Sequence, residues 1–134
     1  MFTTQENGDY AFSNARRNVH GSIDCEVTLA ETGEVIPFTA SPDDTEEYGR
    51  VLYNQLNTTY ISQVTDITQE ELDEYAASKV RKKRNKILVK TDWTQNADVP
   101  QATRDLWAPY RQALRDVPGQ TGFPYEITWP TPPA

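Results

Sequence analysis

The chain has 134 residues, a hydrophobic content of 37% and a formal net charge of −7. This length suits one domain or a small domain with an extension, and a mean hydropathy of −0.73 leaves little apolar surface for a large core. No apolar run approaches the roughly 18 residues of a membrane-spanning helix, and the N-terminus lacks the basic and apolar regions of a signal peptide. Cys25 is the only cysteine, which excludes an internal disulfide and favours folding in the cytoplasm.

The charge is distributed unevenly along the chain. Residues 1–66 contain three Lys or Arg against eleven Asp or Glu, which gives −8, whereas residues 67–134 contain ten against nine, which gives +1. Such a change often separates parts that have different contacts. We therefore predict two domains: an acidic β-rich module with one helix over 1–66, and a helical hairpin with an extended C-terminal arm over 67–134.

The N-terminal half has the pattern of an antiparallel sheet. Residues 22–29 alternate between apolar and polar side chains, which predicts a half-buried strand. A glycine-containing turn leads to a second strand over 35–39, and Pro37 places that strand at an edge because proline cannot donate a ladder hydrogen bond. Residues 10–19 are a candidate third strand, and the polar residues 1–9 are expected to be a loose lead-in.

Three helices are predicted after the sheet. Ser41 and the Pro-Asp-Asp that follows it are typical of a helix start, and that helix should end near Asn57. Thr68 and Glu71 form a capping box for a helix that runs to about Thr91. Since Pro109 would disrupt a helix interior, we expect a separate turn over 101–104 and a helix from 105 to 117. The predicted fold class is α+β.

The last two helices are expected to form a hairpin with a tryptophan on either side of its turn. Apolar residues at three- and four-residue intervals define the buried face of the second helix: Leu106, Trp107, Tyr110, Ala113, Leu114 and Val117. After Gly122 the chain should be extended, because proline and β-branched residues dominate its sequence.

Seven cations over residues 79–90 form the sharpest charge feature. A Lys/Arg cluster can neutralise nucleic-acid phosphates, but the net charge is −7, the cations surround the helix, and no nucleic-acid motif follows. The cluster also fits a solvated helix face, or contact with an acidic partner or the chain's own acidic half. Nucleic-acid binding through residues 79–90 is therefore the alternative function and not the first.

The sequence provides little support for catalysis. His20 is the only histidine, and Cys25 lies on an expected strand, where a small buried role is typical. The acid pairs at 43–44 and 46–47 suit a helix start. We expect no enzymatic activity, no cofactor and no metal site.

Aromatic residues in the C-terminal half are the remaining candidates for function. In a lean domain most of them should be core, but aromatic and arginine side chains are also enriched in the anchors of protein interfaces. The candidate partner-binding residues are Trp93, Trp107, Tyr110, Arg111, Phe123 and Trp129.

The C-terminal half resembles the phage tail assembly chaperone family, also described as tail fibre assembly proteins. The family pattern is R-x-x-L-L-x-x-T-D-W-T-Q, then W-x-x-Y-R-Q-x-L-R-D, then F-P and W-P. The residues that match it here are Arg84, Ile87, Leu88, 91–95, Trp107, 110–112, 114–116, 123–124 and 129–130. Residues 21–50 are also similar to a tail-fibre-associated module, although Val35 stands where such segments more often have tryptophan.

The resemblance implies a protein of bacteriophage assembly and not an enzyme. It implies binding to a tail fibre or baseplate protein in the host cytoplasm, either by a chaperone that departs or by a structural component that stays in the virion tail. Both possibilities remain open at the level of sequence.

Overall fold

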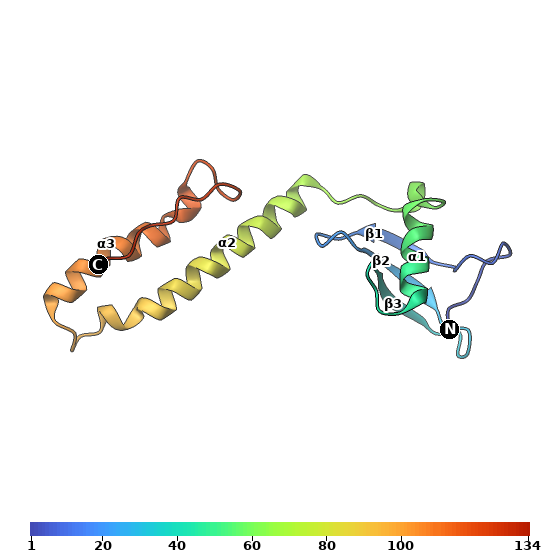
Figure 1. Ribbon diagram of the computed structural model, residues 1–134, viewed down its shortest axis with the longest axis horizontal. Helices are drawn as coiled ribbons and strands as arrows, with labels where there is room; N and C mark the ends of the chain where they lie inside the picture. Colours follow the sequence, from blue (N-terminus) through green and yellow to red (C-terminus); the bar gives the residue numbers. More distant parts are fainter. The chain divides into compact units, whose positions relative to one another are not determined.

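The computed structural model describes residues 1–134. It divides into two compact units, Met1–Glu71 and Leu72–Ala134. The first unit contains a three-stranded sheet and a helix, and the second contains helices and the C-terminal segment (Figure 1). The predicted α+β class is confirmed.

The sheet of the first unit is antiparallel, with strand order β1-β2-β3. Its strands are β1 (Ser13–Arg17), β2 (Ile23–Thr28) and β3 (Val35–Ala40), which confirms the three predicted strands. Pro37 pairs with Glu26 across the β2–β3 ladder. Since β3 is an outer strand, the edge position predicted from Pro37 is confirmed.

Helix α1 (Glu47–Asn57) covers one face of the sheet (Figure 1). The alternation of β2 points Ile23, Cys25 and Val27 to this face, and each is at most 5% exposed. Leu52 and Leu56 of α1 are fully buried against them. The apolar faces of one helix and one sheet therefore supply the core of this unit.

Two predictions for this unit are wrong. Residues 1–9 are not a loose lead-in, because Phe2 is 7% exposed and packs edge-on against Phe38 and Tyr48. The first helix begins at Glu47 and not near Ser41. The Ser41 carbonyl accepts a hydrogen bond from the Asp44 amide, and the Asp44 carboxylate accepts one from the Glu46 amide. These local bonds hold a turn that competes with the helix.

The second unit contains most of a long helix and a shorter one. Helix α2 (Gln69–Thr91) begins as predicted, and the Thr68 hydroxyl accepts a hydrogen bond of 3.2 Å from the Glu71 amide. A 3-10 turn, η2 (Asp92–Gln95), leads to α3 (Gln101–Arg115), which runs back in the opposite direction from α2 (Figure 1). The predicted helical hairpin is present, and none of the helices combines the length and apolar character needed to cross a membrane.

The predicted break before Pro109 is wrong, because α3 is continuous from Gln101 to Arg115. Pro109 and Asp105, whose carbonyl loses its helical donor, both lie on the exposed side of α3. Solvent can reach that carbonyl, so the cost of an interior proline is lower here than in a packed helix. Leu106 was also expected to be buried but is 55% exposed.

The start of the C-terminal segment differs from the expected extended chain. Residues 121–125 form turns, in which the amides of Tyr125 and Glu126 both donate to the Gly122 carbonyl. The Phe123–Pro124 peptide bond is cis. Residues 127–134 have no regular secondary structure.

Candidate protein-binding site at the helical hairpin

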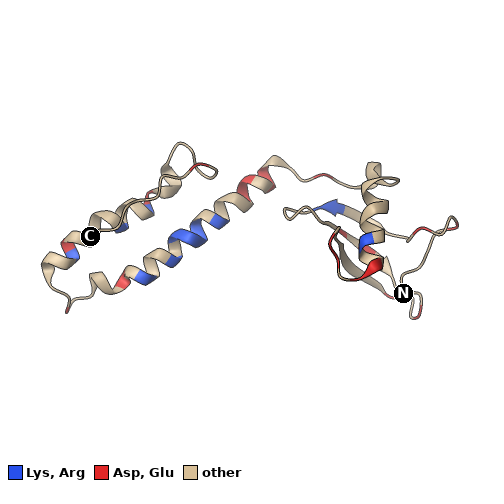
Figure 2. Ribbon diagram, in the orientation of Figure 1, with Lys and Arg blue, Asp and Glu red and all other residues tan.

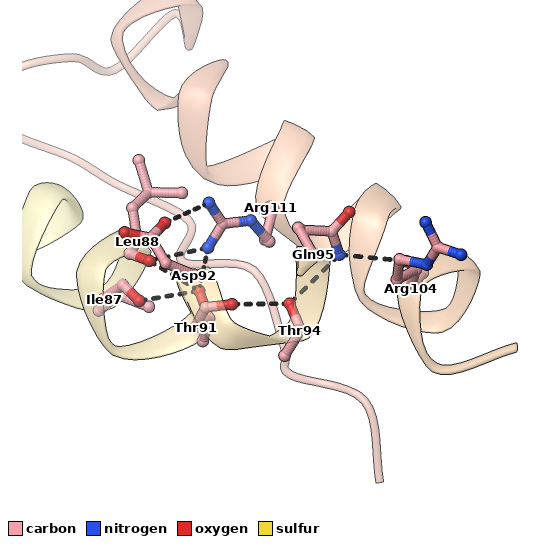
Figure 3. Close-up of polar contacts among 8 residues, drawn as sticks. All are labelled: Ile87, Leu88, Thr91, Asp92, Thr94, Gln95, Arg104 and Arg111. Carbon is pink, nitrogen blue, oxygen red and sulfur yellow. Dashed lines mark hydrogen bonds and ion pairs between the residues drawn. The ribbon is translucent and has the colours of Figure 1, made fainter. Parts of the chain in front are cut away.

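Arg111 joins α3 to the C-terminal end of α2 (Figure 3). Its guanidinium donates hydrogen bonds to the Leu88 carbonyl at 2.7 Å and to the Thr91 hydroxyl and the Asp92 carboxylate at 2.6 Å each. The last carbonyls of a helix have no partner within the helix, and the negative end of its dipole favours a cation. Arg111 therefore caps α2 from the neighbouring helix.

Threonine hydroxyls extend this network through the turn. Thr91 donates to the Ile87 carbonyl at 2.9 Å, and the fully buried Thr94 donates to the Thr91 carbonyl at 2.6 Å. Gln95 then donates to the Thr94 hydroxyl and, at 3.1 Å, to the Arg104 carbonyl of α3 (Figure 3). Bonds of this kind hold the turn in one conformation, because the buried threonine hydroxyls at its centre all have partners. The Nε atoms of Arg104 and Arg111 are buried without a hydrogen-bond partner.

An aromatic cluster lies next to this network and consists of Trp93, Trp107 and Tyr110. The ring centroids of Trp93 and Trp107 are 6.2 Å apart, and those of Trp107 and Tyr110 are 5.8 Å apart. Trp93 is 53% exposed, whereas the other two are half-buried. The cluster thus presents a large aromatic ring to solvent from a hydrogen-bonded support.

The two other aromatic candidates belong to a separate contact between the C-terminal segment and α2. The Lys83 ammonium lies 4.4 Å from the centroid of the Trp129 ring, and the Arg81 guanidinium lies 5.2 Å from that of Phe123. The Tyr125 hydroxyl adds a hydrogen bond to the Asp73 carboxylate at 2.5 Å. Phe123 and Trp129 are half-buried, so they hold this segment on α2 by cation–π contacts.

Residues 77–134 match the family model of the phage tail assembly chaperone protein. The match covers 58 of the 134 residues, and this segment is similar to the phage tail assembly chaperone family. Comparison with curated proteins and with solved structures gives no match. The resemblance found in the C-terminal half is thus confirmed. The likeness of residues 21–50 to a tail-fibre-associated module lies outside the matched segment and stays a prediction.

All six candidate residues lie within the family segment, but they have different surroundings. Trp93, Trp107 and Tyr110 form one cluster, Phe123 and Trp129 contact α2, and Arg111 is 5% exposed inside the network. The contacts that Arg111 makes here position the turn, and its role in partner binding stays a prediction.

Sequence reasoning missed the residues that hold these aromatic rings in place. Thr91, Asp92 and Thr94 fix the turn, while Arg81 and Lys83 hold the C-terminal segment. The close spacing of polar residues after α2 was the available signal for the turn. The contacts of Arg81 and Lys83 could not be predicted, because sequence periodicity does not show that a cation will contact an aromatic ring about forty residues later in the chain.

No group of three or more His, Cys, Asp or Glu side chains is placed to hold a metal ion. Cys25 is 5% exposed, and burial, with smaller effects from the Asp24 and Glu26 carboxylates, raises the pKa of its thiol to about 11. A thiol with this pKa is protonated at neutral pH and a poor nucleophile.

Proposed function

We propose that this protein acts in the assembly of a phage tail, as a chaperone that binds a tail fibre or baseplate protein in the host cytoplasm. The match of residues 77–134 to the tail assembly chaperone family supports the role in tail assembly. The aromatic cluster supports a binding role, and we propose that the protein works by binding and not by catalysis. The specific partner is part of the proposal.

The observation that carries the binding role is the exposure of Trp93 on a fixed turn. A tryptophan in a lean domain normally contributes to the core, yet Trp93 remains 53% exposed beside Trp107. Aromatic side chains held on a rigid support lose little conformational entropy on binding and are common anchors of protein interfaces. We therefore assign the partner's apolar contact to this cluster.

The test is co-purification and titration of this protein with the tail fibre and baseplate proteins of the same phage. Trp93→Ala should weaken binding by about 2 kcal/mol or more, which is roughly 30-fold in Kd. Ile61→Ala is the matched control, because Ile61 is a similarly exposed apolar residue in the first unit. Equal affinity for wild type and Trp93→Ala would remove the cluster from the interface.

Mass spectrometry of purified phage particles tests the second part of the proposal, the fate of the protein after assembly. A fixed ratio of this chain to the fibre would identify a retained structural component of the tail. Presence in infected cells together with absence from particles would identify a chaperone that departs.

A further inference from the structure

Helix α2 of the second unit has two contrasting faces. One carries buried or half-buried residues at helical spacing, among them Ala77, Val80, Leu88 and Thr91. The opposite face, hereafter the basic face, is exposed along its length. The residues of the basic face are Ser78, Lys82, Asn85, Lys86, Val89 and Lys90.

Three lysines of the basic face have no partner. Lys82, Lys86 and Lys90 are spaced at i, i+4 and i+8, and none forms an ion pair in the structure. The sequence contains no acidic residue from 76 to 91. Like charges one turn apart repel each other, so this stripe is unfavourable for the isolated helix.

The other cations of the run are occupied within the unit. Lys79, Arg81 and Lys83 lie over the rings of Tyr75, Phe123 and Trp129, and Arg84 donates two hydrogen bonds to the Asn85 side chain. The seven cations therefore do not act together. Figure 2 shows that Lys and Arg residues lie in the middle and C-terminal part of α2. Of these cations, Lys82, Lys86 and Lys90 remain available.

The basic face is also shaped for contact. An open trough of about 720 Å³ runs along it, lined by its residues together with Arg81. Val89, which is 69% exposed, is the apolar residue among those that line it. From Ser78 to Lys90 the trough is about 18 Å long, at 1.5 Å of rise per residue.

We propose that the basic face of α2 binds an acidic amphipathic helix of another protein. Carboxylates at i, i+4 and i+8 on that helix have the same one-turn spacing as Lys82, Lys86 and Lys90 and would relieve their repulsion. An apolar side chain between them covers Val89. This surface shares no residue with the aromatic cluster, and the inference does not depend on what that cluster binds.

Charge and composition favour an acidic helix over nucleic acid. A polyanion is attracted to many cations at once, whereas the stripe has three lysines beside the uncharged Ser78, Asn85 and Val89. A short helix with a few carboxylates and an apolar centre matches this mixture of a few cations with uncharged residues.

The test uses the full chain and a labelled synthetic helix with glutamates at i, i+4 and i+8 and leucines at i+3 and i+7. Fluorescence anisotropy should detect binding, and Lys86→Glu should weaken it by about 10-fold or more. Arg115→Glu is the matched control, because Arg115 is an exposed cation on α3. The affinity of this variant for the peptide should stay within about twofold of the wild-type value. Lys86→Gln is a milder change and should cause a smaller loss of affinity. Circular dichroism should show unchanged helix content in each variant, which excludes misfolding as the cause.

Three results would overturn the proposal. One is that the protein binds a peptide with glutamine in place of glutamate as tightly as it binds the glutamate peptide. Another is that Lys86→Glu and Arg115→Glu lose equal affinity for the glutamate peptide. The third is binding of labelled duplex DNA, with a steep loss on adding salt, in a protein that does not bind the peptide. That result would assign the stripe to nucleic acid.

Discussion

The Arg111 guanidinium on α3 lies 2.6 Å from the carboxylate of Asp92, the first residue after α2. The Arg111 side chain is 7% exposed, whereas that of Asp92 is 61% exposed. The two ends of this ion pair therefore contribute differently. Asp92 can be hydrated without its partner, but the buried cation depends on the bonds it makes to Asp92, Leu88 and Thr91.

Arg111→Met should lower the free energy of unfolding of the second unit by roughly 2–3 kcal/mol, since it removes three charge-assisted hydrogen bonds and the cap of α2. Urea unfolding followed by tryptophan fluorescence measures this, because all three tryptophans lie in that unit. Asp92→Asn should cost about 1 kcal/mol or less, because its carboxylate is largely hydrated. A larger loss for Asp92→Asn than for Arg111→Met would contradict this order.

Lys83→Met should loosen the C-terminal segment, because it removes the cation that lies 4.4 Å from the Trp129 ring. A cation–π contact at a partly exposed site contributes about 0.5–1 kcal/mol. Hydrogen exchange of the amides in residues 125–129 should accelerate accordingly. Lys82→Met is the control, because it makes the same change at a neighbouring lysine without a ring contact. Equal acceleration in both variants would mean that helix charge, and not the ring contact, controls the segment.

Sequence patterns predicted the elements whose periodicity is local. The alternation around Cys25 and the capping box at Thr68 both gave the elements that the structure shows. Long-range contacts were missed, because nothing near Phe2 in the sequence indicates that its ring packs against Phe38 and Tyr48. The expected disruption by Pro109 also placed the start of the last helix wrongly, because α3 is continuous through it. The low helix propensity of proline does not indicate whether its position faces solvent, where the disruption costs less.

The same distinction applies to the candidate site. The sequence pattern predicted a hairpin with a tryptophan on either side of its turn, and in the structure the ring centroids of Trp93 and Trp107 are 6.2 Å apart. The pattern could not predict which ring would stay exposed, because burial depends on the whole hairpin. Nor could it place Arg111 inside, since an arginine in the last helix has the same local signature whether it caps a neighbour or faces solvent.

Pro109→Ala should stabilise the second unit by about 1–3 kcal/mol, because alanine restores a donor for the Asp105 carbonyl and has the highest helix propensity. Position 109 is exposed, so the change removes little packing. The free energy of unfolding, measured in urea by tryptophan fluorescence, should increase. The magnitude of the helical ellipticity at 222 nm should increase as well. Destabilisation would show that proline is needed to set the contact between Trp107 and Tyr110.

Cys25 should make the first unit sensitive to alkaline pH. Its thiol has a pKa of 9.0 as an ordinary cysteine and about 11 in the fold, chiefly because burial disfavours the thiolate and secondarily because of the Asp24 and Glu26 carboxylates. Since the folded pKa is the higher one, the protonated thiol stabilises the fold below about pH 9. That contribution, roughly 2–3 kcal/mol, is lost as the pH rises from about 9 to 11.

Unfolding monitored by far-ultraviolet circular dichroism at several pH values should show this loss. Cys25→Ala provides the comparison: below pH 9 it lowers stability by leaving a small cavity, but its stability should fall less steeply between pH 9 and 11. Below pH 9 the two proteins should have parallel curves, and a disulfide reagent should modify the wild-type thiol slowly until the unit unfolds. Rapid modification of the folded protein at pH 8 would show that the thiol is accessible and that burial does not control its pKa.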